Sequence, residues 1–125
     1  KRIYKKGLAK NYRLLGEIVQ LAHDDKQMSS PMTLLDVCQY LDTGQASLYR
    51  VCNDYFGMGI IEMMTQIRLE EARRALLMQK QNHTSRKTTV REIAIYYGFK
   101  HQGRFSRRYF TTFGELPSQT IEGIK

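Results

Sequence analysis

The 125-residue sequence contains no tryptophan, only two prolines and two cysteines, and no long apolar run. A membrane-spanning helix needs roughly 18 apolar residues, so we expect no membrane association. Two cysteines are too few for a disulfide framework or an all-cysteine zinc site, which favours a reducing, cytoplasmic location. The scarcity of proline and the absence of a glycine period exclude collagen-like and mucin-like sequences. With 42% hydrophobic and 26% charged residues, the composition is typical of a folded domain.

Recognisable motifs for catalysis are also absent. The chain has no glycine-rich phosphate-binding loop, no His-Glu-x-x-His metal helix and no nucleophile elbow. We therefore expect a protein that is not an enzyme and that uses neither a metal ion nor a cofactor.

Acidic residues are the minority charge, with 12 Asp and Glu against 20 Lys and Arg, which gives a net charge of +8. The excess lies at the two ends, because residues 1–13 carry +6, residues 14–85 carry −3 and residues 86–125 carry +5. A basic surplus on a small domain is typical of a polyanion-binding protein. We interpret residues 1–7 as a basic arm or linker.

Apolar residues recur at helical spacing throughout, and no segment alternates with the period of a strand. The sequence therefore predicts an all-α fold of about seven helices. A helix is expected over residues 8–23, with this inward face: Leu8, Tyr12, Leu15, Val19 and Ala22. A long linking helix is expected over 60–78, and the polar run 79–88 indicates a loop.

The chain contains an internal repeat of two short helices joined by a tight turn. Thr33 and Thr89 each begin a capping box, in which the threonine side chain accepts from the third amide of the helix. Each copy ends at a glycine, which suits the left-handed residue that closes a helix. The matched residues are Thr33 and Thr89, Asp36 and Glu92, Val37 and Ile93, Cys38 and Ala94, Tyr40 and Tyr96, Gln45 and Gln102, Leu48 and Phe105, Arg50 and Arg107, Phe56 and Phe113, and Gly57 and Gly114.

This length and pattern predict two helix-turn-helix units. The first subdomain is expected over residues 8–79, including the linking helix, and the second over residues 80–125. In a helix-turn-helix, the second helix enters the major groove of DNA and its core-averted side chains meet the base edges.

The base-reading side chains are expected on the core-averted face of each second helix. In the first copy they are Gln45, Ala46, Tyr49 and Arg50, and in the second Gln102, Gly103, Arg104, Ser106 and Arg107. Asn53 and Phe110 lie on the same faces, and an alternative position for Tyr49 is over the edge of the core. Arginine pairs with guanine, glutamine with adenine, and apolar groups contact the thymine methyl. Weaker, phosphate-directed contacts are expected from Thr33, Thr89, Lys100 and His101.

Both copies resemble the AraC/XylS family of bacterial transcription regulators over about residues 8–121. The motifs of the second copy are Thr89–Ala94, Gly98-Phe99, Phe105–Arg107, Tyr109, Phe113-Gly114 and Pro117-Ser118. Those of the first half are Thr33-Leu34, Leu48, Arg50, Phe56-Gly57 and Arg68–Leu76. Departures from the family pattern are Phe110-Thr111, where basic residues are common, and Thr120, where an aromatic residue is usual.

The resemblance implies a seven-helix domain whose two helix-turn-helix units, joined by a long helix, read adjacent major grooves. It also implies a possible sensing domain upstream in the full-length protein. We expect sequence-specific binding of double-stranded DNA, with RNA polymerase as a further partner. The alternative function is that of a basic helical protein-interaction module without sequence-specific DNA binding.

Overall fold

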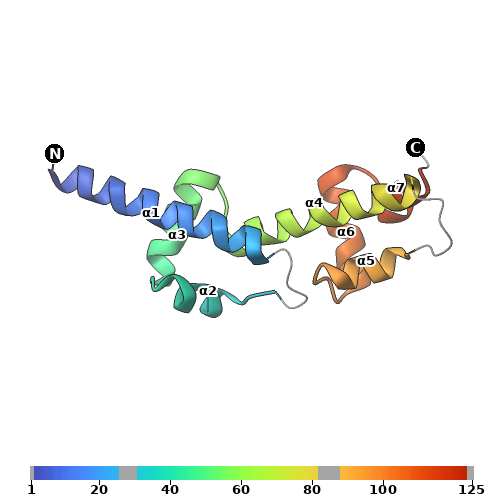
Figure 1. Cartoon of the computed structure of the whole chain (residues 1–125), viewed down its shortest axis with the longest axis horizontal. Coiled ribbons are helices and arrows are strands. Elements are labelled where there is room, and N and C mark those ends of the chain that lie inside the picture. Colours follow the sequence, from blue (N-terminus) through green and yellow to red (C-terminus); the bar gives the residue numbers. More distant parts are fainter. Residues whose placement is uncertain (1, 26–30, 82–87, 124–125) are drawn as a thin grey trace. The chain divides into compact units, whose positions relative to one another are not determined.

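The structure is a computed structural model that describes the backbone of residues 2–25, 31–81 and 88–123, and the side chains of residues 12–25, 31–79 and 88–123. Over these ranges the chain forms seven α-helices and no strand, which confirms the all-α prediction (Figure 1). The helices are α1 (Arg2–Asp25), α2 (Leu34–Leu41), α3 (Gln45–Phe56), α4 (Ile60–Gln81), α5 (Val90–Tyr96), α6 (Gln102–Phe113) and α7 (Pro117–Glu122).

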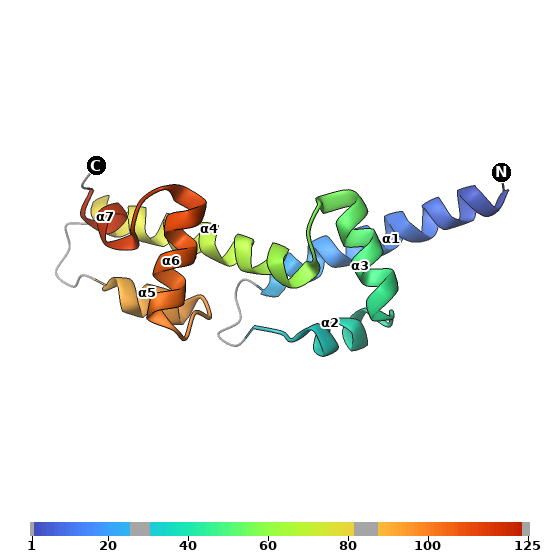
Figure 2. The same ribbon diagram turned by 180° about the vertical axis from the view of Figure 1, so that it is seen from behind.

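The chain divides into two compact units, and the division falls within α4. The first unit holds α1, α2, α3 and α4 as far as Ile67, and the second holds α4 from Arg68 together with α5, α6 and α7 (Figure 2). The expected boundary lay at 79/80, after the linking helix, whereas here each unit uses part of that helix in its own core. Residues 2–7, interpreted as an arm or linker, belong to the backbone of α1.

The core of the first unit forms where α1, α2, α3 and the beginning of α4 meet. Spacings of four and three residues place Leu14, Ile18 and Leu21 on one side of α1, and all three are buried. The other buried apolar residues of this core are Ala22, Val37, Cys38, Leu41, Leu48, Val51, Cys52, Ile60 and Met64.

The inward face predicted for α1 is confirmed at Ala22 and at Leu15, which packs against the core, but it is wrong at Tyr12 and Val19. Tyr12 and Val19 are 59% and 52% exposed, Leu15 is half-buried, and the side chain of Leu8 lies outside the described residues. The helix carries two adjacent apolar stripes with the same helical spacing, so periodicity alone does not distinguish them. Packing of α2 and α3 against the stripe of Leu14 and Ile18 decides which is buried.

Tyr55 of α3 is also on the surface, at 42% exposure. Its ring centroid lies 6.5 Å from that of Tyr12 on α1. The two tyrosines therefore cover the edge of the first core rather than fill it.

Both predicted capping boxes are confirmed. The Thr33 hydroxyl oxygen accepts from the Asp36 amide at 3.2 Å, and the Thr33 amide donates to the Asp36 carboxylate at 3.1 Å. In the second unit, the Glu92 amide donates to the Thr89 hydroxyl at 3.1 Å, and the Thr89 amide donates to the Glu92 carboxylate at 3.0 Å. These bonds fix where α2 and α5 begin, and hence where the turns and then α3 and α6 follow.

The core of the second unit is rich in aromatic residues. The ring of Phe105 on α6 lies between those of Phe99, in the preceding turn, and Tyr109, with centroid distances of 4.9 and 5.7 Å. The ring of Tyr109 lies 4.7 Å from that of Phe113. The buried apolar residues that complete this core are Leu69, Ala72, Leu76, Ile93 and Ala94. Such tilted and edge-to-face pairs stabilise a core beyond their buried area, and here they join the turn before α6 to the inward face of α6.

A buried arginine joins α4 to the turn of the second unit. Arg68 is 2% exposed, and its Nη1 donates to the carbonyl oxygen of Tyr97 at 2.7 Å. Tyr97 closes α5, and Gly98 follows with a φ of 92°, a left-handed conformation that glycine adopts without steric cost. The charged group therefore satisfies a carbonyl in the turn that leads to α6.

Candidate nucleic-acid interface

Helix α3 turns one face to the core of the first unit and the opposite face to solvent. Its buried residues are Leu48, Val51 and Cys52. The four predicted base-reading residues are all exposed: Gln45, Ala46, Tyr49 and Arg50. The side chain of Tyr49 is 64% exposed. The sequence pattern therefore brings the four residues together on one accessible face.

Helix α6 repeats this arrangement in the second unit. Phe105 and Tyr109 are buried, at 1% and 0% exposure, and fix which side of the helix faces inward. The exposed predicted readers are Gln102, Gly103, Arg104 and Arg107, while Ser106 is half-buried. The placement leaves two guanidinium groups and one amide on the outer face near the beginning of the helix.

The packing around position 103 does not require a glycine, because a larger side chain would have space there. A Cβ atom built on this residue would meet no other heavy atom within 4 Å, and its φ lies outside the positive region that favours glycine. Neither the space around this residue nor its backbone conformation therefore requires a glycine.

The residues predicted to contact phosphate are exposed at the beginnings of helices. The hydroxyl oxygens of Thr33 and Thr89 accept hydrogen bonds from their own helices, and the Thr89 hydroxyl also donates to the Glu92 carboxylate. The Thr33 hydroxyl proton and the first backbone amides of α2 and α5 can donate to an anion. His101 occupies the N-cap position of α6 and makes no side-chain cap hydrogen bond, and Lys100 beside it is exposed. Both of these side chains are exposed at the beginning of α6.

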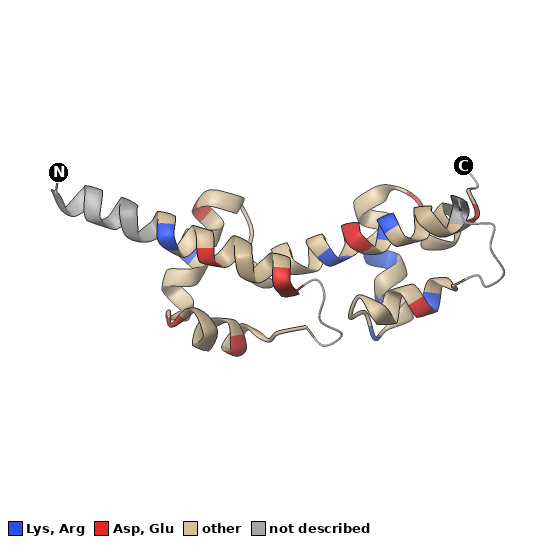
Figure 3. Ribbon diagram, viewed as in Figure 1, with Lys and Arg blue, Asp and Glu red and all other residues tan. Residues whose placement is uncertain are grey.

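The two units differ in charge on these elements, as the residues coloured in Figure 3 show. Residues 33–57 contain one arginine, Arg50, against three aspartates, whereas residues 89–114 contain five basic residues and one glutamate. Hydrogen bonds from Thr33 lower the pKa of the Asp36 carboxyl below its ordinary value. Of the two helix-turn-helix segments, the one over residues 89–114 therefore carries the net positive charge.

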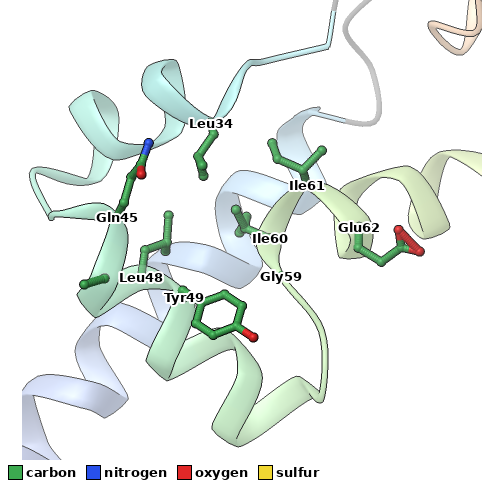
Figure 4. Close-up of a pocket in the computed structure, with 9 residues that line it drawn as sticks. Leu34, Gln45, Leu48, Tyr49, Gly59, Ile60, Ile61 and Glu62 are labelled. Carbon is green, nitrogen blue, oxygen red and sulfur yellow. The ribbon is translucent and has the colours of Figure 1, made fainter.

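An apolar cavity of about 520 Å³ adjoins the reading face of α3. Figure 4 shows Leu34, Ile60 and Ile61 opposite the beginning of α3. Leu34 lines this cavity and is 38% exposed, as is Ile61. Ala46 and Tyr49 form part of the same wall, so the reading face of the first unit is continuous with an apolar surface.

A buried hydrogen bond between two side chains joins α6 to α7 in the second unit. The hydroxyl of Tyr109 donates to the Oγ1 of Thr120 at 2.7 Å, and the Thr120 hydroxyl also contacts the Glu115 carboxylate. The Arg73 guanidinium lies 5.1 Å from the ring centroid of Phe113, an arrangement suited to a cation–π interaction. Burial raises the pKa of Tyr109 above its ordinary value, while the hydrogen bond with Thr120 acts in the opposite direction.

Sequence reasoning did not identify these positioning residues. Arg68 and Arg73 occur in a helix that also carries exposed charges, so neither residue type nor spacing marks them as buried contacts. Thr120 stood out only as a departure from the family pattern. Among the described residues there is no group of three or more potential metal ligands, and no helix long and apolar enough to cross a membrane.

Comparison with known proteins assigns this arrangement to a class. A family model described as a helix-turn-helix domain matches residues 37–123. The chain is 29% identical over 119 residues to XylDLEGF operon transcriptional activator 2 of Pseudomonas putida, covering 95% of this chain and 72% of that protein. It is 33% identical over 108 residues to XylDLEGF operon transcriptional activator 3 of the same organism, covering 86% of this chain and 31% of that protein.

A solved structure shares the fold. It is described as a transcriptional regulator with an AraC-type DNA-binding domain from Chromobacterium violaceum, and it matches with a TM-score of 0.71 at 24% identity over 90% of this chain and 93% of that chain. The fold and its two exposed second helices define a DNA-binding domain of a transcription regulator. The chain belongs to the AraC/XylS-type helix-turn-helix family, as its repeat predicted.

Proposed function

We propose that this domain inserts α3 and α6 into successive major grooves of one DNA duplex. The observation that carries the proposal is the repetition of one exposed face on two helices, with Arg50 and Arg107 at matched positions. The centres of successive major grooves are separated by one helical turn, roughly 34 Å. One monomer would then read a contiguous and asymmetric site, because the two faces carry different side chains.

Base recognition follows from the donors on each face. Arg50 and Arg107 each provide the paired donors that match the O6 and N7 atoms of guanine. Gln45 and Gln102 match the donor and acceptor on the major-groove edge of adenine. Ala46 and Tyr49 offer apolar contact, whereas Arg104 and Ser106 add hydrogen bonds to bases or phosphates.

The units divide affinity and selectivity between them. Phosphate neutralisation by the basic second unit, through residues such as Lys100 and Arg104, supplies most of the sequence-independent affinity and most of its salt dependence. The first unit is net negative over residues 33–57, so it chiefly selects sequence through Arg50 and its neighbours. Thr33, Thr89 and His101 lie where helix starts would meet the phosphates.

The domain acts as part of a transcription regulator rather than as an enzyme. The relatives carry the names of operon activators, and the chain spans less than a third of the length of one of them. We therefore place it in the bacterial cytoplasm with DNA and RNA polymerase as partners and with a sensing domain upstream in the full-length protein. Activation would follow from holding polymerase near the DNA site.

The proposal is tested by selecting bound sequences from random duplex DNA and footprinting the protein on the selected site. We expect one asymmetric motif with two protected major-groove segments on one face of the duplex. Recovery of no motif would favour the basic protein-interaction module. Protection of a single groove would contradict the two-groove mode while retaining DNA binding.

A further inference from the structure

Phe110 is a large apolar side chain on the outer face of α6. It is 52% exposed, whereas the inward-facing Phe105 and Tyr109 of the same helix are 1% and 0% exposed. Much of the Phe110 ring therefore lies outside the core of the second unit. The matched position in the first unit is Asn53, which is also exposed, so the two reading helices differ in chemistry here.

The position of Phe110 along α6 places it in line with the reading residues. Seven residues separate it from Gly103, nearly two full helical turns, so the two lie along one line of the helix surface about 10.5 Å apart. Ser106 and Arg107 lie between them on either side of this line. A helix that approaches DNA closely at Gly103 therefore brings Phe110 towards the wall of the same groove.

The surroundings of Phe110 favour DNA over an apolar protein surface. Arg104 and Arg107 are exposed on the same helix, and the second unit is basic over residues 89–114. Those charges attract a polyanion and oppose burial against an apolar partner. Phenylalanine has no hydrogen-bond donor or acceptor, and the apolar group that DNA presents in the major groove is the C5 methyl of thymine.

We propose that Phe110 is a specificity-determining residue that contacts a thymine methyl at the edge of the site read by α6. The inference rests on the proposed insertion of α6 into a major groove. The contact of Phe110 adds a preference for thymine at one base pair, beside the base pairs contacted by Gln102 and Arg107. The contact is apolar, so it contributes selectivity without adding to the salt dependence of binding.

The experiment uses the sequence selected from random DNA and replaces each thymine by deoxyuridine, which removes only the methyl group. For the unaltered protein, we expect one substitution, within the base pairs whose preference depends on Arg107, to weaken binding about fourfold. In Phe110→Ala the same substitution should have no effect, because the methyl has lost its partner. Fluorescence anisotropy with both duplexes gives the four dissociation constants of this cycle.

Three further variants separate the contact from other effects. Phe110→Leu keeps an apolar group and should retain part of the response to deoxyuridine, whereas Phe110→Lys should lose the response and steepen the dependence on salt. Tyr96→Ala removes another exposed aromatic ring of the second unit, 68% exposed and outside α6, and should leave the response unchanged. Circular dichroism verifies that each variant is folded, as expected for exposed positions.

The outcomes distinguish this inference from the proposed function. If a motif is selected but no thymine in the Arg107-dependent part responds to deoxyuridine, Phe110 does not read a methyl and the inference is overturned. The same holds if the response persists in Phe110→Ala, since another residue then makes the contact. If no motif is selected, the groove-insertion proposal fails and the inference fails with it.

Discussion

The hydroxyl of Tyr109 donates a 2.7 Å hydrogen bond to the Oγ1 of Thr120, and both residues are at most 2% exposed. The bond joins the middle of α6 to α7. Because α6 carries the predicted reading residues on its other face, this buried contact fixes the side of the helix that remains available for DNA.

Removing either partner is expected to destabilise the second unit by different amounts. Thr120→Val keeps the shape but takes away the acceptor of the buried Tyr109 hydroxyl, so we expect a loss of about 1–3 kcal/mol. Tyr109→Phe removes the donor itself and should cost about 1 kcal/mol. Urea unfolding followed by circular dichroism measures both, and the double variant should lose less than the sum. Strict additivity would show that the two side chains do not interact.

The stability of the second unit is expected to fall in alkaline solution. Burial raises the pKa of Tyr109 above its ordinary value of 10.0, so the unfolded chain loses this proton at lower pH than the folded chain. Its contribution is therefore complete below about pH 10 and is lost as the pH rises through the folded pKa. Burial and the nearby Glu71 raise the pKa of Tyr97 in the same direction.

Urea unfolding at about pH 8 and about pH 11 tests this expectation. Tyr109→Phe should lose less stability between the two pH values than the unaltered protein. Tyr97→Phe provides a second comparison, since each tyrosine should account for part of the decline. An identical decline in the protein and both variants would assign the alkaline effect to other groups.

The two capping boxes are expected to contribute similar stability to the two units. Thr33→Ala and Thr89→Ala each remove the acceptor of one helix-end amide, at a cost of about 1 kcal/mol. Thr33→Ser and Thr89→Ser are the matched controls, because serine retains the hydroxyl and should behave nearly as threonine does. Thermal unfolding measures all four. Equal losses for serine and alanine would show that the methyl group, rather than the hydrogen bond, is what matters.

Substitution of Arg107 is expected to separate base reading from charge. Arg107→Ala should weaken binding to the selected site by about 1–3 kcal/mol and relax the preference at one base pair. Arg107→Lys keeps the charge but loses the paired donors, so it should relax the preference while retaining affinity for random DNA. Equal losses of Arg107→Ala on selected and random duplexes would make this residue a phosphate contact. Arg50 should behave in the same way in the first unit.

The salt dependence of binding is expected to belong mainly to the second unit. Lys100→Ala and Arg104→Ala should each lower the slope of log affinity against log salt by about 0.9 if the residue neutralises one phosphate. Gln45→Ala in the first unit is the control and should change base preference with little effect on the slope. Titrations at several salt concentrations with random duplex DNA measure these slopes. Unchanged slopes in both basic variants would contradict the proposed division between the units.

Local chemistry was sufficient to predict the repeat and the reading faces. Each threonine capping box is made from residues three positions apart, and each glycine terminator depends on the backbone of its own residue. The burial of Leu48 and Phe105 follows from helical spacing, and it directs Arg50 and Arg107 outward. Such features depend on near neighbours in the chain, so their physical causes are visible in the sequence.

Long-range packing decided what the sequence left ambiguous. The two apolar stripes of α1 have the same spacing, and the one containing Ile18 is buried because α2 and α3 pack there. The hydrogen bond between Arg68 and Tyr97 joins residues 29 positions apart in the sequence. This bond and the one between Tyr109 and Thr120 form only where different elements meet in the folded chain. The sequence by itself thus determined the helices, the repeat and the outward faces of Arg50 on α3 and Arg107 on α6. The tertiary structure decided which apolar stripe and which polar side chains are buried, because desolvation and hydrogen-bond partners depend on all the elements that surround a residue.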